Sequence, residues 1–225
     1  MTHLPVNKKV LNENDVLAAA LRADFVKHGV FVLNLISGPG SGKTALLERT
    51  LASYHVGRRV AVLTGDIPTS SDAQRLAKYG FPVRQITTAG VCHLDARMIR
   101  LALEGWNLSD INTLFIESLD NLVCPTSFDL GEHAKVVVLS VTEGEETPLK
   151  YPDIFYNAEL MILSKIDLLP YVPFDLDQAK ANARLVHPGI EIIGVSSTSG
   201  AGFIEWLAWL EHRRDVSKLA SSLPA

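Results

Sequence analysis

The chain has 225 residues, 47% of them hydrophobic, and a net charge of −4 from 21 basic and 25 acidic side chains. This length suits one domain with a sizeable core, and the nearly balanced charge excludes a strongly basic nucleic-acid module. No stretch approaches roughly 18 consecutive apolar residues, and the start of the chain lacks the apolar segment of a secretory signal. We therefore expect a cytoplasmic protein with no membrane-spanning helix.

The predicted elements alternate between helices and strands along the chain. After a loose segment over residues 1–11, the spacing of apolar residues predicts a helix over 12–28. Short apolar runs, typical of strands buried on both faces of a sheet, then alternate with helical spacing. The strands are predicted over 30–36, 59–64, 83–87, 113–116, 135–141, 160–163 and 190–195, and the later helices over 41–54, 72–79, 94–103, 175–185 and 202–219.

This alternation predicts βαβ units, and hence an α/β fold with a mostly parallel sheet and helices on both faces. Because the sequence contains no internal repeat, low-complexity tract or linker rich in Pro, Gly or Ser, we expect residues 12–225 to form one domain. Ligands of such sheets bind beyond the carboxyl ends of the strands. The loops that follow strands are therefore where the chemistry is expected.

The loop after the first strand carries a phosphate-binding pattern. Its residues 37–44 read SGPGSGKT, which is GxxxxGK[ST] with serine in the first glycine place. Glycines let backbone N–H groups converge on a phosphate, and the following helix points its positive end at the anion. We expect Lys43 to reach the β- and γ-phosphates and the Thr44 hydroxyl to bind Mg²⁺. The other expected phosphate contacts come from Gly38, Gly40, Ser41 and Gly42. The sequence therefore predicts a P-loop NTPase.

A second loop is expected to read the base. The sixth predicted strand ends in Ser164-Lys165-Ile166-Asp167, where guanine-binding GTPases carry Asn-Lys-x-Asp. Asp167 could accept two hydrogen bonds from guanine N1–H and the 2-amino group, whereas adenine would leave it unpaired at a cost of about 1–3 kcal/mol. We expect Lys165 to lie over the base and Ser196, after the last strand, to belong to the same pocket. Ser164 lacks the amide with which asparagine ties this loop down.

The two cysteines need a separate explanation, because two thiols in a chain of this length do not make a disulfide framework. Cys92 is followed at once by His93, and Cys124 comes shortly after another predicted strand. Thiolate and imidazole ligands suit Ni²⁺ or Zn²⁺ rather than Mg²⁺. Three ligands fall short of a closed tetrahedral site, which a two-fold dimer could complete. From spacing alone, the alternative that both cysteines are small buried hydrophobes stays open.

Several long blocks of the sequence match a known family. They are GVFVLNLISGPGSGKTALLE, GDIPTSSDAQRL, AGVCHLDARM, FIESLDNLVCPTSFDLGEHAKVVVLSVTEGEETPLKYPDIF, SKIDLLPYVPFDLD and SSTSGAGFIEWLAWL. The chain resembles the hydrogenase nickel-incorporation GTPases, the HypB family, over about residues 11–210.

This resemblance implies a function and a set of partners. It implies a G domain that binds GTP and GDP, forms a nucleotide- or metal-dependent homodimer, and hands nickel towards the [NiFe]-hydrogenase large subunit with a HypA-type metallochaperone. The Ni²⁺ or Zn²⁺ ligands of the family fall on Cys92, His93 and Cys124. The magnesium and switch carboxylates of the family fall on Asp66 and Asp72, and a strand-end carboxylate falls on Glu117.

One departure from the family pattern bears on hydrolysis. The family reads ENVGNLVCP where this chain reads ESLDNLVCP, so Asp120 stands where a glycine N–H meets the γ-phosphate. A carboxylate about 4 Å from a phosphate charge is repelled by about 4 kcal/mol at an effective dielectric constant of about 20. Catalysis is expected to depend on Lys43, Thr44, Asp66, Glu117 and Asp120. The chain also lacks an N-terminal CxxCGC site and a histidine-rich stretch, which implies that it does not store nickel.

Asp120 lies four residues before Cys124, which suggests that the γ-phosphate orders this loop and so repositions the thiol. Two other functions stay open at this point. One is a nucleotide- and metal-binding scaffold that barely hydrolyses GTP, which Asp120 and Ser164 favour. The other is a P-loop kinase for a small molecule, which needs an arginine-bearing lid; Arg97 and Arg100 are the candidates. The acidic run at Glu143, Glu145 and Glu146 is interpreted as a solvated surface.

Overall fold

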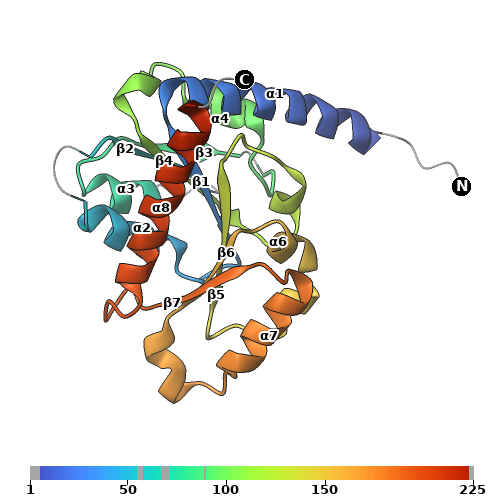
Figure 1. Cartoon of the computed structure of the whole chain (residues 1–225). Helices are drawn as coiled ribbons and strands as arrows, with labels where there is room; N and C mark the ends of the chain where they lie inside the picture. Colours follow the sequence, from blue (N-terminus) through green and yellow to red (C-terminus); the bar gives the residue numbers. More distant parts are fainter. Residues whose placement is uncertain (1–5, 55–57, 67–70, 89, 223–225) are drawn as a thin grey trace, which may run out of the picture.

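In the computed structural model, seven strands form one sheet (Figure 1). The structure describes residues 6–54, 58–66, 71–88 and 90–222. Every neighbouring pair of strands is parallel, which confirms the predicted sheet. The order across the sheet is β3-β2-β4-β1-β5-β6-β7. The strands are β1 (Phe31–Ser37), β2 (Val60–Asp66), β3 (Val83–Thr87), β4 (Thr113–Asp120), β5 (Ala134–Ser140), β6 (Leu160–Ser164) and β7 (Glu191–Val195).

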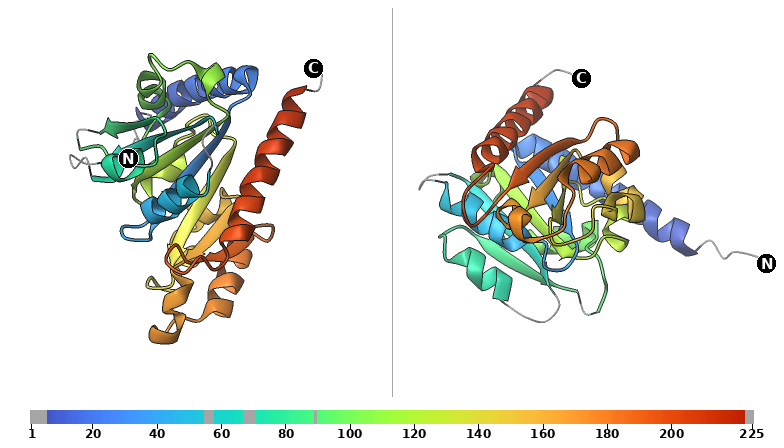
Figure 2. Two further views of the ribbon diagram at one scale, coloured as in Figure 1. Left: turned by 90° about the vertical axis from the view of Figure 1, so that its left-hand side faces the viewer. Right: turned by 90° about the horizontal axis from the view of Figure 1, so that it is seen from below.

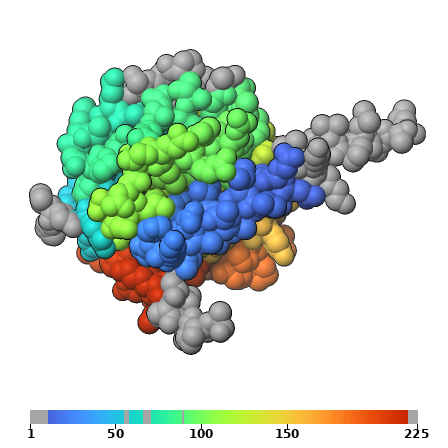
Figure 3. All heavy atoms as spheres, turned by 90° about the horizontal axis from the view of Figure 1, so that it is seen from above, coloured from blue at the N-terminus to red at the C-terminus, as the bar shows by residue number. Residues whose placement is uncertain are grey.

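Helices cover both faces of the sheet, because successive side chains of a strand point to opposite faces and most of them here are apolar. In β1, Leu33 and Leu35 pack towards α2 (Lys43–Ala52), α3 (Ser71–Ala77) and α8 (Phe203–Ser222), whereas Val32 packs towards α1 (Val6–His28) and α4 (Ala96–Ala102). A third cluster packs α6 (Pro152–Tyr156) and α7 (Leu176–Val186) against β5 and β6. Figure 2 shows α8 (red) lying along the sheet, and Figure 3 shows α1 (blue) against the green segment that contains α4.

The helices match the predicted ones at most positions, with additions. They are α1 (Val6–His28), α2 (Lys43–Ala52), α3 (Ser71–Ala77), α4 (Ala96–Ala102), α5 (Thr147–Lys150), α6 (Pro152–Tyr156), α7 (Leu176–Val186) and α8 (Phe203–Ser222), with 3-10 helices η1 (Leu108–Asp110), η2 (Cys124–Ser127) and η3 (Ile166–Tyr171). The short elements α5, α6 and η1 to η3 span too few residues to show a helical period. Among the described residues, no helix is long and apolar enough to cross a membrane.

Two boundaries differ most from the prediction. The first helix begins at Val6 rather than at residue 12, so the described part of the predicted loose segment is helical; residues 6–11 contain no Gly or Pro that would stop a helix. β4 continues past the predicted residue 116 to Asp120. The extension is polar at Glu117, Ser118 and Asp120, so it lacks the apolar run from which the strand was predicted.

The carboxyl ends of the parallel strands meet at one edge of the sheet. At this edge β1 ends in Ser37, β2 in Asp66, β4 in Asp120, β6 in Ser164 and β7 in Val195. Each predicted site loop follows one of these ends, apart from the loop with Cys92 and His93, which follows β3. The fold therefore gathers the sequence-predicted residues along a single rim, as expected for an open α/β sheet.

Candidate functional site

The loop between β1 and α2 has the geometry of a phosphate cradle. Gly40 and Gly42 adopt left-handed backbone angles, with φ of +71° and +95°, which glycine takes without strain. Gly42 directly precedes α2, so the free N–H groups of that helix face the loop. The Lys43 side chain is only 3% exposed, and its ammonium donates a hydrogen bond to Ser37 Oγ at 2.7 Å. Ser37, in the first glycine place of the motif, thus positions the lysine.

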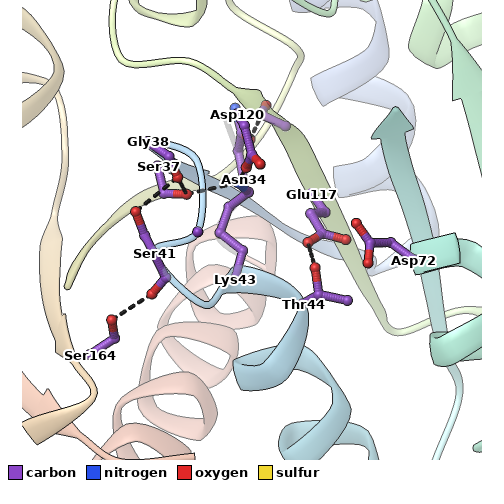
Figure 4. A network of polar contacts seen from close by, with 12 residues as sticks. Asn34, Ser37, Gly38, Ser41, Lys43, Thr44, Asp72, Glu117, Asp120 and Ser164 are labelled. Carbon is purple, nitrogen blue, oxygen red and sulfur yellow. Dashed lines mark hydrogen bonds and ion pairs between the residues drawn. The ribbon is translucent and has the colours of Figure 1, made fainter. Parts of the chain in front are cut away.

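Oxygen ligands suited to a divalent cation lie beside this loop. Thr44 Oγ1 donates to Glu117 Oε1 at 2.6 Å, while the buried Glu117 Oε2 has no partner among the described residues (Figure 4). Burial raises the pKa of Glu117, and the Thr44 hydrogen bond and the Lys43 charge oppose that rise. Asp72 faces Glu117 from α3 and contributes a second carboxylate. This buried, unpartnered carboxylate oxygen beside the P-loop threonine fits the hard oxygen ligands that Mg²⁺ prefers.

Asp66, the remaining carboxylate predicted for the cation, ends β2, where its backbone pairs with Thr87 of β3. Its side chain lies outside the described part of the chain.

The base-side loop is tied to the phosphate loop despite the missing asparagine. Ser164 Oγ donates to the carbonyl of Ser41 at 2.5 Å, and Lys165 Nζ donates to the carbonyl of Gly40 at 2.7 Å. The serine hydroxyl therefore supplies a donor to the phosphate loop in place of the asparagine amide. Asp167 lies in the first turn of η3. Ser196 is fully buried, and its Oγ accepts from Ser199 N at 2.9 Å, which shapes the turn after β7.

The two cysteines come together above the sheet edge. Cys92 Sγ lies 2.6 Å from Cys124 Sγ, and both are free thiols. Cys92 is exposed and Cys124 half-buried, so the alternative of two buried hydrophobes does not hold. The hydrogen bond with Cys124 raises the pKa of the Cys92 thiol.

The third predicted ligand, His93, lies farther from Cys92 than Cys124 does. Its ring stacks on Phe128 with 3.8 Å between ring centroids, and its Nδ1 lies 3.9 Å from Cys92 Sγ. Burial lowers the pKa of His93 and so favours the neutral imidazole that a metal requires. Within the ranges that the structure describes, no set of three or more His, Cys, Asp or Glu side chains forms a ready metal cluster. One chain thus brings two sulfurs together, and the complete ligand set stays a prediction.

Asp120 lies beside Lys43, at the phosphate-binding end of the loop. Its carboxylate forms an ion pair with the ammonium of Lys43, rather than standing free as a repelling charge (Figure 4). The next residue, Asn121, donates from Nδ2 to the carbonyl of Cys92 at 3.1 Å and accepts from Val123 N at 2.8 Å. A cavity of about 160 Å³ is lined by Lys43, Asp72, Glu117, Asp120, Asn121 and Cys92, among others. The phosphate-binding lysine and one thiol therefore share a cavity.

Glu143 is a site residue that was not predicted from the sequence. Its Oε2 accepts from Ser41 Oγ at 2.9 Å and from Ser140 N at 2.7 Å. A Cβ added to Gly38 would lie 2.7 Å from Glu143 Oε1, so a larger residue here would displace the Glu143 carboxylate. The interpretation of Glu143 as part of a solvated charge run is wrong, because its carboxylate braces the phosphate loop. The signal that could have found it is its place just beyond the end of β5.

This parallel sheet, with a glycine-rich strand-to-helix loop holding a buried lysine, defines a P-loop nucleotide-binding protein. The model of the CobW/HypB/UreG nucleotide-binding domain matches residues 31–194. The hydrogenase maturation factor HypB of Azotobacter vinelandii is 51% identical over 211 residues, which are 94% of this chain and 70% of that protein. HypB of Escherichia coli K12 is 52% identical over 211 residues, covering 94% and 73%. The chain therefore belongs to the HypB family of hydrogenase maturation factors, which are P-loop GTPases.

Solved structures agree with this assignment. The crystal structure of HypB from Archaeoglobus fulgidus is 37% identical with a TM-score of 0.84, covering 90% of this chain and 99% of that one. HypB from Helicobacter pylori in complex with nickel is also 37% identical, with a TM-score of 0.86 and coverage of 92% and 97%. A LAO/AO transport system kinase matches at 13% identity and a TM-score of 0.54, covering 99% of this chain and 82% of that one, and shares the fold alone.

Proposed function

We propose that this chain is a GTP-binding, GTP-hydrolysing metallochaperone in which nucleotide state governs nickel delivery during [NiFe]-hydrogenase maturation. The observation that carries the proposal is the shared cavity, which both Lys43 and Cys92 line. A group that binds Lys43 in this cavity lies within reach of the loops that hold the thiols. Nucleotide and metal can then influence each other through a few residues.

On the nucleotide side, each residue has a role that its position supports. Lys43 and the loop N–H groups hold the phosphates, and Thr44 with Glu117, Asp72 and Asp66 would hold Mg²⁺. When bound, Mg²⁺ neutralises charge on the phosphates during transfer. Guanine is read by Asp167, with Lys165 along the base, and Ser196 shapes the neighbouring turn.

On the metal side, nickel is cargo rather than a resident cofactor. Cys92 and Cys124 offer two thiolates, His93 offers a third ligand, and the same set from a second protomer would complete a four-coordinate site. The nickel in the Helicobacter pylori relative supports nickel as the cargo. Zinc has similar ligand preferences and is the competing ion.

The partners follow from the family. We propose a cytoplasmic, nucleotide- or metal-dependent homodimer built from one G domain per chain. A HypA-type metallochaperone and the hydrogenase large subunit are the proposed protein partners. The curated names of the relatives, which are hydrogenase maturation factors, support this assignment.

A second candidate function is a scaffold that binds nucleotide and metal but barely hydrolyses GTP. The ion pair between Asp120 and Lys43 favours it, because Lys43 is the residue that the transferred phosphoryl group needs. A single-turnover assay with GTP separates the two functions. Release of phosphate within minutes supports the GTPase, and retention of intact GTP over hours supports the scaffold.

The proposed function is tested by titrating Ni²⁺ into protein that is nucleotide-free or holds GDP, the slowly hydrolysed analogue GTPγS, or ATPγS, with native mass spectrometry as the readout. We expect the nickel affinity and the dimer fraction to differ between the GDP and GTPγS samples. ATPγS should behave like the nucleotide-free sample, because Asp167 is left unpaired by adenine. Asp167→Asn should weaken GDP and GTPγS alike. Equal nickel binding in all four samples would contradict the coupling.

A further inference from the structure

The ammonium of Lys43 already has an anionic partner inside the chain. Its Nζ donates to Ser37 Oγ and forms an ion pair with Asp120, the last residue of β4. The lysine is 3% exposed, whereas the Asp120 side chain is 55% exposed and open to exchange. In P-loop proteins this lysine contacts the terminal phosphates. Asp120 and a terminal phosphate therefore compete for the same ammonium.

We propose that Asp120 is a specificity-determining residue whose carboxylate stands in for the terminal phosphate on Lys43, so that the site favours GDP over GTP and keeps the thiol pair together without a triphosphate. This inference rests on the proposed function, since it assumes that guanine nucleotides occupy the phosphate loop. It adds the preferred phosphorylation state and the residue that sets it.

The preference follows from charge. A terminal phosphate that reaches Lys43 approaches the Asp120 carboxylate, and two anions on one ammonium repel each other. Asp120 must then leave Lys43. A diphosphate ends one phosphate earlier and is held largely by loop N–H groups, so it disturbs the ion pair less. The fold thus penalises the triphosphate more than the diphosphate.

Backbone strain at Asp120 does not cause the preference for the diphosphate. Lys165 is the one non-glycine residue with a positive φ in the described ranges, so Asp120 has ordinary backbone angles. Replacement of the glycine found in the family therefore does not strain the chain here. The carboxylate charge is the feature to test, and Asp120→Asn removes it while keeping the size and shape of the side chain.

Asn121 links this contact to the thiols. Its side chain binds the carbonyl of Cys92 with one end and the N–H of Val123 with the other, so a single amide holds both thiol-bearing loops. Cys92 Sγ and Cys124 Sγ lie 2.6 Å apart in this arrangement. Because Asn121 directly follows Asp120, displacement of Asp120 from Lys43 shifts the amide and separates the sulfurs.

The first test compares the affinities of GDP and GTPγS in the parent chain and in Asp120→Asn by calorimetry. We expect the ratio of GTPγS affinity to GDP affinity to rise about tenfold, which is about 1.4 kcal/mol. The matched control is Glu146→Gln, which removes one exposed negative charge that is paired with Lys150 rather than with Lys43. The control should leave the ratio unchanged. An unchanged ratio in Asp120→Asn, or the same rise in Glu146→Gln, would overturn the proposal.

The second test measures Ni²⁺ affinity of the same proteins, nucleotide-free and with GTPγS. In the parent chain GTPγS should weaken nickel binding, whereas Asn121→Ala should bind nickel about tenfold more weakly even without nucleotide, a loss of about 1.4 kcal/mol. Val123→Ala keeps both Asn121 contacts, since it changes a side chain that is 61% exposed, and is the control. Asp120→Asn should also bind nickel more weakly when nucleotide-free, and this keeps the test valid if Asn121→Ala does not fold.

The outcomes distinguish a failure of the proposed function from a failure of the roles given to Asp120 and Asn121. A parent chain that binds neither guanine nucleotide nor nickel contradicts the proposed function itself. A parent chain whose nickel affinity changes with nucleotide contradicts only the role of Asp120 and Asn121 if Asp120→Asn keeps the parent's ratio of GTPγS to GDP affinity and Asn121→Ala keeps the parent's nickel affinity.

Discussion

The phosphate loop and the thiol pair lie along one edge of the sheet, yet they are held very differently. Side chains from two other loops brace the phosphate loop: Ser164 and Lys165 bind its carbonyls, and Glu143 binds its Ser41 hydroxyl. The thiol pair is held by the amide of Asn121 and by the stacking of His93 on Phe128, and Cys92 is exposed. A rigid, buried cradle suits a nucleotide that must be recognised each time, whereas a loosely held exposed pair suits cargo that must leave.

The largest effect should follow from Lys43→Ala. Loss of a charge-assisted contact to phosphate should lower GDP affinity at least about 100-fold, which is about 2.7 kcal/mol. Fluorescent nucleotide binding measures it, and Lys180→Ala, which removes a charge on α7 that is paired with Asp177, is the control. If Lys43→Ala bound GDP as the parent does, the phosphate loop would not be the recognition element.

Cys124→Ala tests the thiol pair. Loss of an outer-shell partner costs about 10–100-fold in metal affinity, so loss of a ligand should weaken Ni²⁺ or Zn²⁺ at least that much. GDP affinity should stay nearly constant, because the cradle does not depend on the thiols. Metal competition with a chromogenic chelator, run beside a GDP titration, checks both. Parent-like metal affinity would remove Cys124 from the ligand set.

Glu117→Gln sharpens the contrast by separating stability from Mg²⁺ binding. Because burial raises the pKa of Glu117, this carboxyl supports stability fully below its unfolded pKa and loses that contribution as pH rises through the folded pKa. Without Mg²⁺, we expect the variant to be more stable by about 1 kcal/mol at pH 8 and no more stable at pH 4. Thermal melts in EDTA measure this, while Mg²⁺-dependent nucleotide binding should fall. A parent-like melt at pH 8 would mean that the charge is compensated.

Ser164→Ala should have the smallest effect. It removes one bond of about 1 kcal/mol to the Ser41 carbonyl, so GDP affinity should fall about fivefold. Lys165 and Glu143 keep the loop in place, and Ser164→Asn should restore binding because its amide can donate to the same carbonyl. A loss as large as that in Lys43→Ala would show that the cradle has a single support instead of several.

Much of the fold was predictable from the sequence, because buried parallel strands consist of apolar runs and the phosphate loop has a fixed pattern. The loop residues Lys43 and Thr44 lie where their spacing placed them relative to β1 and α2. The two thiols also meet as their loops suggested, each lying near the carboxyl edge of the sheet. These are features that local sequence specifies.

The contacts that set the behaviour of the site were not predictable. The bond from Asn121 to Cys92 spans 29 residues and that between Ser41 and Glu143 spans 102, so neither leaves a local pattern. Asp120 was visible as a departure from the family, but a sequence does not show which way a carboxylate turns. Here the Asp120 carboxylate turns towards the buried ammonium of Lys43 and forms an ion pair with it.

The position of Asp120 as the terminal residue of β4 has a mechanical consequence. β4 pairs with β2 only as far as Glu117, and after a register shift its end at Asp120 pairs with Ser37 of β1 alone. The end of β4 is therefore held on one side only, and η2, which begins at Cys124, follows Asp120 closely in the chain. Because Cys124 comes only four residues after Asp120, displacement of Asp120 from Lys43 can move the Cys124 thiol while the rest of the sheet keeps its position.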